Sequence, residues 1–150
     1  MALHSPDLLE LLLKDHVDSS GTTIPGADPN IYFANGHTAL PNVVRWRQRN
    51  KHAFNTLTLL LQYNADPNLA HIHTKVTPLM IAAYSPQEIE YMKLLLEYGA
   101  DVTAVNTAGH TVLNMLFNNN GYRNEPSLAI ISLCKEYIDI NAPGSKPVLK

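Results

Sequence analysis

The feature that most constrains the fold of this chain is an internal repeat with a period of 34 to 39 residues. Three segments open with Thr-x-Leu, and these openings begin at Thr38, Thr77 and Thr111. An acidic residue recurs with nearly the same period, at Asp28, Asp66, Asp101 and Asp139. Because two independent markers keep one period, the sequence predicts a stack of similar units rather than one irregular core.

The residue types inside the repeat predict two helices per unit. Thr77 fits the N-cap of a first helix, because its hydroxyl can accept a hydrogen bond from a free N–H of the first turn. Pro78 fits the first helical position, where a missing N–H costs nothing. The triplet Leu94-Leu95-Leu96 predicts a second helix with a broad apolar face, as a helix between two neighbours needs. Gly99 and Asn64 fit the left-handed position that follows a helix end.

Taken in order, these elements resemble an ankyrin repeat. The resemblance is carried by Thr77-Pro78-Leu79-Met80-Ile81-Ala82-Ala83, by residues 94–102 and by Gly109-His110-Thr111-Val112-Leu113, and it covers about residues 26–142. It implies an all-α ankyrin-repeat solenoid of about three helix-turn-helix repeats with hairpin fingers. The repeats are expected at residues 26–64, 65–99 and 100–138, with a degenerate N-terminal half-repeat and loop in residues 1–25 and a tail in residues 143–150.

Start and stop signals place the outlying helices. Ser5-Pro6-Asp7 predicts a helix over residues 8–16, followed by a loop near residues 19–25, and Ser85-Pro86-Gln87-Glu88 predicts another helix start. The last helix is expected over about residues 127–137, with Asp139-Ile140-Asn141 beginning a further finger. The links between paired helices are longer than the family pattern near residues 45–54 and 118–126. Added loops of this kind are favourable places for partner specificity.

Composition narrows the function classes. The chain has 150 residues, 45% of them hydrophobic, and a formal net charge of −2, which gives no general attraction to nucleic acid or membranes. A single cysteine excludes an internal disulfide and a cysteine-rich zinc site. No apolar run approaches the about 20 residues that cross a bilayer. The start of the chain lacks the pattern of a signal peptide, so we expect an intracellular protein, cytoplasmic or nuclear.

The sequence offers no set of residues for catalysis. It contains no nucleophile elbow, no phosphate-binding glycine loop and no His-Glu-x-x-His. His71 and His73 are too few for a zinc site, and Cys134 is expected to be a small buried apolar residue because it occupies the register position of Leu96. We therefore expect no enzyme activity, no cofactor and no metal.

Two local features depart from the repeat. The segment from Arg45 to Lys51 holds four positive charges and Trp46, which indicates either a solvated helix end or an anchor for an acidic peptide, nucleic acid or acidic lipid. The first finger carries Ile31-Tyr32-Phe33 where the family has polar residues. These side chains either contact a partner or cover the N-terminal helix and loop.

The resemblance implies binding to another protein through finger tips and the concave face of the first helices. The expected role is that of an adaptor, a scaffold or an inhibitor; the alternative is nucleic-acid or acidic-lipid binding through Arg45–Lys51. An N-terminal helix rich in leucine leaves open that the chain is part of a longer ankyrin protein, or that a partner covers its ends. The predicted contact residues are Tyr32, Phe33, Trp46, Arg47, His71, His73, Tyr84 and Asn106.

Overall fold

Helices of the two expected kinds make up most of the described chain. The computed structural model describes residues 5–46, 51–84, 89–118 and 125–141. The helices are α1 Ser5–Leu13, α2 Ala39–Trp46, α3 Ala53–Gln62, α4 Pro78–Ala82, α5 Ile89–Glu97, α6 Val112–Asn118 and α7 Glu125–Asn141. Two short strands, β1 His16–Val17 and β2 Thr23–Ile24, lie between the first two helices. The chain is therefore a mostly helical repeat solenoid.

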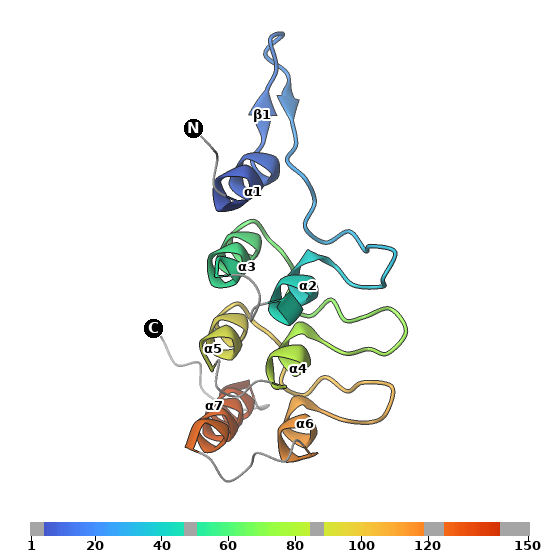
Figure 1. Ribbon diagram of the computed structural model, residues 1–150, viewed down its shortest axis with the longest axis vertical. Helices are drawn as coiled ribbons and strands as arrows, with labels where there is room; N and C mark the ends of the chain where they lie inside the picture. Colours follow the sequence, from blue (N-terminus) through green and yellow to red (C-terminus); the bar gives the residue numbers. More distant parts are fainter. Residues whose placement is uncertain (1–4, 47–50, 85–88, 119–124, 142–150) are drawn as a thin grey trace.

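The helices stand in two columns (Figure 1). We call α2, α4 and α6 the inner column, and α1, α3, α5 and α7 the outer column. Each inner helix packs against the outer helix that follows it in the chain, and α4 also packs against α2 and α6. Loops project from the inner column on the side away from the outer column (Figure 1). The columns thus place these loops side by side along one edge of the molecule.

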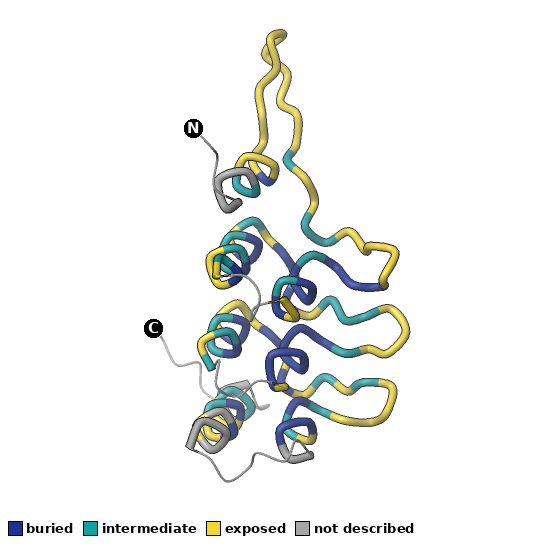
Figure 2. The backbone as a smooth tube through the Cα atoms, viewed as in Figure 1, coloured by how far each residue is buried: buried dark blue, intermediate teal, exposed yellow. Residues whose placement is uncertain are grey.

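The helix α4 shows how the repeat sequence produces this packing. Thr77 has an extended backbone, and its Oγ1 accepts a hydrogen bond from Met80 N at 3.2 Å, as expected for an N-cap. Pro78 occupies the first turn. All five residues of α4 are buried, because neighbouring helices cover it on several sides (Figure 2). A helix surrounded in this way has to be apolar around its whole circumference.

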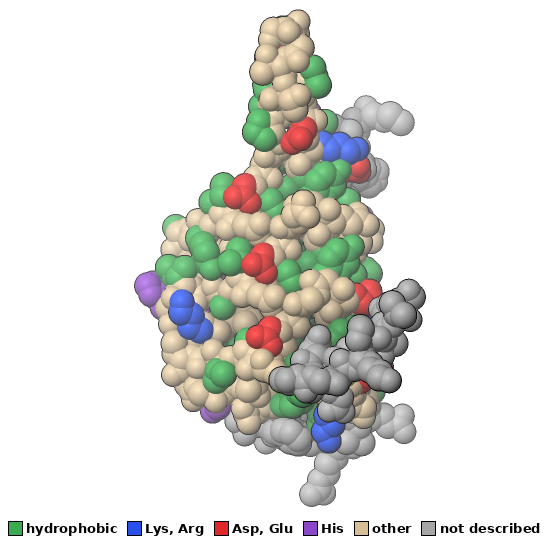
Figure 3. All heavy atoms as spheres, turned by 180° about the vertical axis from the view of Figure 1, so that it is seen from behind, with side chains coloured by type: hydrophobic (Ala, Val, Ile, Leu, Met, Phe, Trp, Pro, Cys, Tyr) green, Lys and Arg blue, Asp and Glu red, His purple; other side chains and the backbone are tan. Residues whose placement is uncertain are grey.

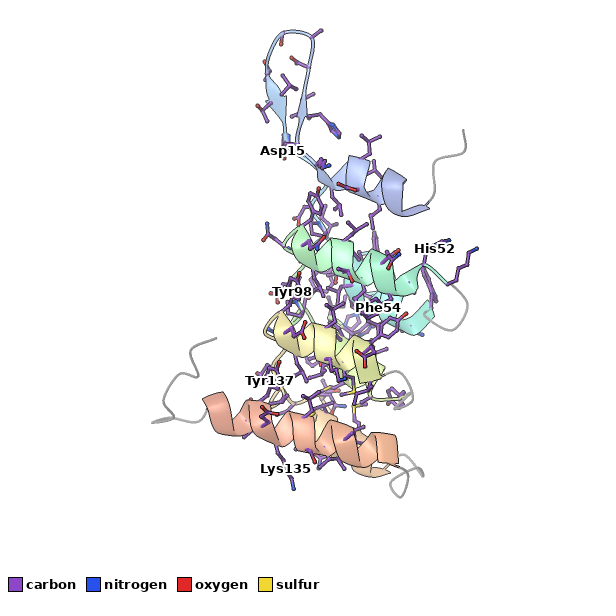
Figure 4. All side chains as sticks on the ribbon, turned by 90° about the vertical axis from the view of Figure 1, so that its left-hand side faces the viewer. Asp15, His52, Phe54, Tyr98, Lys135 and Tyr137 are labelled. Carbon is purple, nitrogen blue, oxygen red and sulfur yellow. The ribbon has the colours of Figure 1, made fainter. Side chains whose placement is uncertain are left out.

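The leucine triplets fill the space between the columns. Leu60 and Leu61 of α3 are 2% and 3% exposed, and Leu95 and Leu96 of α5 are 0% and 1% exposed. Cys134 of α7 is fully buried, which confirms its expected role as a small apolar residue. On the outer column, the rings of Phe54 and Tyr91 meet edge to face with centroids 5.3 Å apart and join α3 to α5 (Figure 4). The core is thus continuous from one helix pair to the next.

The outer helices α3 and α5 end in the same hydrogen-bonded corner. Ala65 N donates to Leu60 O and Ala100 N donates to Leu95 O, both at 2.9 Å. Asn64 and Gly99 come just before these alanines, and both have positive φ, 64° and 86°. The sequence prediction of left-handed corners is confirmed at these two positions.

The first corner contains an insertion that changes the predicted N-terminal part. Ala27 N donates to Leu12 O at 2.7 Å, so Ala27 and Leu12 occupy the places of Ala65 and Leu60. By this register, residues 16–25 are an addition between Asp15 and Gly26. The prediction of a helix over residues 8–16 is wrong at both ends, because α1 starts at Ser5 and leaves the helical path after Leu13.

The inserted residues form a β-hairpin rather than the expected loop. β1 and β2 pair antiparallel, with His16 opposite Ile24 and Val17 opposite Thr23. The Asp18 carboxylate closes the turn by accepting hydrogen bonds from the backbone N–H groups of Ser20 and Thr22. The hairpin projects beyond α1 at one end of the stack (Figure 1), and the expectation of an all-α chain needs this correction.

Asparagine side chains fasten one repeat to the next. Asn30 Nδ2 donates to Asn64 O at 2.9 Å, and Asn30 Oδ1 accepts from Asp66 N at 2.8 Å. Asn68 makes the same pair of bonds to Gly99 O at 3.0 Å and Asp101 N at 2.7 Å. Each amide therefore satisfies one donor and one acceptor of the following corner, where no helical partner is available.

The C-terminal prediction also needs correction. Asp139-Ile140-Asn141 does not begin a finger, because α7 continues through these residues. The expected helix start at residues 85–88 lies outside the described residues, as does most of the predicted loop near residues 118–126.

None of the described helices has the length and apolarity needed to cross a membrane.

Two glycines at outer-helix corners give contrasting predictions. A Cβ on Gly26 would fall on the Leu13 carbonyl group, whereas a Cβ on Gly99 would meet nothing within 4 Å. We expect Gly26→Ala to lower the free energy of unfolding by about 3 kcal/mol through overpacking. Gly99→Ala should cost about 1 kcal/mol, from its positive φ alone. Urea unfolding followed by circular dichroism measures both, and equal losses would contradict this assignment.

Candidate functional site

The three loops on the edge of the inner column share one backbone design. We call residues 31–37, 69–76 and 104–110 fingers 1, 2 and 3. Their closing bonds run from Phe33 N to His37 O at 2.8 Å, from His71 N to Val76 O at 3.0 Å and from Asn106 N to His110 O at 3.0 Å. Gly36, Lys75 and Gly109 take the left-handed conformation at the turns. The fingers are therefore ordered hairpin turns.

Neighbouring fingers are joined by backbone hydrogen bonds. Ile72 N donates to Gly36 O at 3.1 Å, and Thr107 N donates to Thr74 O at 3.0 Å. The hydroxyl of Tyr32 adds a bond to Ala70 O at 3.0 Å. Because each finger holds the next, the three tips form one preorganised surface, which lowers the entropy lost when a partner binds.

Apolar side chains are exposed on all three fingers. Ile31 and Phe33 of finger 1 are 58% and 52% exposed, and Tyr32 remains 41% exposed although its hydroxyl is anchored. Ile72 of finger 2 and Val105 of finger 3 are also exposed. Of these, Tyr32 and Phe33 are predicted contact residues, whereas Ile72 and Val105 were not predicted from the sequence. The signal that could have identified them is the repeat register: Val105, like Tyr32, directly precedes the residue whose N–H closes its finger, and Ile72 directly follows that residue in finger 2.

His71 and Asn106, both predicted contact residues, take part in holding the finger turns. His71 Nδ1 accepts from His73 N at 3.3 Å and Thr74 N at 3.1 Å, so Nε2 carries the proton and donates to Asn35 O at 3.1 Å. Asn106 Oδ1 accepts in the same way within finger 3. His73 is exposed, and its ring centroid lies 5.7 Å from that of His71. His71 therefore holds the turn of finger 2 and joins it to Asn35 of finger 1.

A histidine at the base of finger 1 is buried beside a cation. The guanidinium of Arg45 donates to His37 Nε2 at 3.1 Å, and the rings of His37 and His71 lie with centroids 4.5 Å apart. Burial lowers the pKa of His37, and His71 and Arg45 lower it further. His37 Nδ1 is buried and has no hydrogen-bond partner among the described residues. His37 is therefore a neutral structural residue, and Arg45 is partly engaged with it.

The remaining predicted contact residues lie at the ends of inner helices. Trp46 ends α2 and is 59% exposed, and Tyr84, 56% exposed, follows α4 closely. Arg47 and the next three residues lie outside the described residues. The structure thus places Tyr32, Phe33, His71, His73 and Asn106 together on the fingers, and Trp46 and Tyr84 near the inner column.

Metal-ligating and thiol side chains are the remaining candidates for chemistry among the described residues. The described chain contains no group of three or more metal-ligating side chains placed to hold an ion. Burial raises the pKa of the Cys134 thiol to about 11, so the sulfur stays protonated and unreactive at neutral pH. The chemistry available on this surface is contact through apolar side chains and hydrogen bonds.

Comparison with known proteins agrees with this architecture. The sequence model of the family described as "Ankyrin repeats (3 copies)" matches residues 1–106 and also residues 48–142. Ankyrin repeat protein FPV024 of Fowlpox virus (strain NVSL) is 34% identical over 91 residues, 61% of this chain and 14% of that protein. FPV014 of the same virus is 28% identical over 119 residues, 79% of this chain and 24% of that protein. Protein R841 of Acanthamoeba polyphaga mimivirus is 31% identical over 113 residues, 72% of this chain and 17% of that protein. The matched region spans less than a quarter of each of these relatives.

The lowered pKa of His37 predicts a pH-dependent stability. The unfolded chain takes up a proton on this side chain near its ordinary value of about 6.5, whereas the folded chain does so only at lower pH. Below that value the unfolded state binds more protons, so the free energy of unfolding should fall as the pH falls. Urea unfolding between pH 7.5 and about 5 measures this slope.

His110 provides a matched control, because it is exposed at the equivalent place of finger 3. His37→Gln should flatten the slope, and His110→Gln should leave it unchanged. An unaltered slope in His37→Gln would mean that another group causes the pH dependence.

Proposed function

Because the chain belongs to the ankyrin-repeat family, whose repeats are generally protein–protein interaction modules rather than enzymes, we propose that it binds a partner protein through its fingers and the concave face of its inner helices. Three repeats present the surface, and a degenerate half-repeat precedes them. The role is that of an adaptor, a scaffold or an inhibitor that occludes its target. We place it inside the cell, in the cytoplasm or nucleus.

The observation that carries this proposal is the row of exposed apolar side chains on bonded fingers. Phe33, Ile72 and Val105 come from three different repeats, while backbone bonds between the fingers fix their spacing. Aromatic and aliphatic side chains on a rigid frame are typical anchors of protein interfaces. Few charges lie among them, which favours an apolar patch on a protein over a polyanion.

The rival function is nucleic-acid or acidic-lipid binding through Arg45–Lys51. One of the four cations of this segment, Arg45, is hydrogen-bonded to His37, so its charge is directed partly toward the base of finger 1. Phosphate recognition commonly needs several cations on one face. We therefore rank protein binding first and include polyanions in the test.

The first test replaces finger residues. Phe33→Ala combined with Val105→Ala should weaken partner binding at least about tenfold, because truncated anchor side chains commonly cost an interface more than about 1 kcal/mol each. Affinity capture from cells of the source, followed by titration of the purified partner, measures the loss.

Tyr98→Ala is the matched control for this pair. Tyr98 is 40% exposed but lies just beyond the outer helix α5 (Figure 4), so its replacement should leave binding unchanged. Thermal melts of all variants check that the fold is kept. Full binding by the finger variant would refute the use of the fingers.

The second test separates the two functions. Trp46→Ala combined with Arg47→Glu should leave capture of the partner that the fingers bind within about twofold, because neither residue belongs to a finger. The wild type should bind neither a short nucleic-acid duplex nor anionic vesicles at physiological salt. The rival function would be favoured if the wild type bound a polyanion, the variant lost that binding, and the set of captured proteins stayed unchanged.

A further inference from the structure

In the described chain the inner column ends at α2, whereas the outer column continues to α1. Within the column α4 lies between α2 and α6, and all of its residues are buried. One flank of α2 is covered by α4. At the level of α1, the described chain places no helix in the inner column and only an extended segment passes there (Figure 1). The opposite flank of α2 therefore lacks the neighbour that α4 has.

The burial of equivalent residues in α2 and α4 shows this difference. The two helices share the Thr-x-Leu opening, so Ala39 and Val43 correspond to Pro78 and Ala82. Pro78 and Ala82 are buried, whereas Ala39 and Val43 are half-buried. Trp46 follows three residues after Val43, on the same face of the helix, and is 59% exposed. The uncovered flank of α2 is an apolar stripe.

The outer helix α1 borders the same place with exposed leucines. Leu12 has the corner position of Leu60 and Leu95, because all three carbonyls accept the equivalent alanine N–H. Leu60 and Leu95 are 2% and 0% exposed, but Leu12 is 61% exposed and Leu11 53%. Hydrophobic side chains lie around the base of the hairpin in Figure 3 as well. The leucine at this corner position is therefore buried in α3 and α5 but exposed to solvent in α1.

We propose that this end of the stack, formed by Leu11, Leu12, Ala39, Val43 and Trp46, binds a short apolar α-helix from a partner protein. The helix extends the inner column by one place and resembles α4 in being uncharged and apolar around its circumference. Two features indicate this occupant. This end surface is the flank of α2 opposite to the one that packs against α4, and α4 is itself a short apolar helix. The five residues of the proposed surface are all uncharged, and Glu10 and Lys14 of the bordering helix α1 pair with each other at 2.6 Å, so an apolar occupant suits this surface better than a charged one.

This end surface shares no residue with the fingers, so peptide binding to it can be measured without the protein that the fingers bind. The probe is a synthetic peptide with the sequence of residues 76–84, held helical by a side-chain cross-link. Trp46 is the single tryptophan of the chain, and the peptide has none. A saturable blue shift of Trp46 emission on titration, with a Kd below about 1 mM, is the expected result.

Matched variants locate the binding. Leu12→Lys should raise the Kd at least about tenfold, because it places a charge at an apolar contact. Tyr98→Lys changes a 40% exposed residue beyond α5, far along the chain from this surface, and should bind as the wild type does. A peptide carrying Leu79→Lys and Ile81→Lys should give no shift. Both protein substitutions fall on exposed residues, so thermal melts should show an intact fold.

Three outcomes would overturn the proposal. One is the absence of a saturable shift in the wild type, and another is a Leu12→Lys variant that binds like the wild type. The third is a shift that grows with the concentration of the wild-type protein alone, accompanied by dimers in sedimentation and abolished by Leu12→Lys. That result would make a second copy of this chain the occupant in place of a partner helix.

Discussion

Every helix pair in this stack has two apolar faces that must be buried, and the packing, the fingers and the exposed end all follow from that requirement. A single pair has apolar residues on both sides and cannot cover them alone, so pairs are stable only when stacked. The complete burial of α4 and of Leu95 is the result in the middle of the stack. The same constraint leaves Leu12 and the flank of α2 uncovered at the N-terminal end. Stability within the stack and an open end surface thus have one cause.

Stacking also determines how the fingers are held. Successive corners are joined by Asn30 and Asn68, and this places successive fingers close enough to share backbone hydrogen bonds. His71 and Asn106 serve the same turn position with different chemical groups, a ring nitrogen and an amide oxygen. Apolar side chains such as Phe33 can therefore remain exposed without collapsing onto each other. The finger surface is held in place because the scaffold below it repeats.

Sequence patterns predicted the elements whose signals are local. Thr77 and Pro78 identified the start of α4, and Gly99 and Asn64 identified two corners, because capping and left-handed backbone depend on adjacent residues. The N-terminal corner was missed since ten added residues separate Leu11-Leu12-Leu13 from Gly26-Ala27 and hide the repeat register. Asp139 was misplaced because its motif matches a finger, although the helix α7 extends through it. Exposure of Ile72 and Val105 depends on neighbouring fingers, which no local pattern reports.

By itself, the sequence determined the repeat, its family, the order of helices and the absence of recognisable catalytic motifs, since these follow from period and residue type. Only the tertiary structure decided which apolar residues stay exposed, because burial depends on whether another repeat lies alongside. Leu12, Leu60 and Leu95 are the same residue type at the same corner position, yet two are buried and one is open. The difference lies in the neighbours of their helices: α3 and α5 pack against the inner helices α2 and α4, whereas the described chain has no inner helix at the level of α1 (Figure 1).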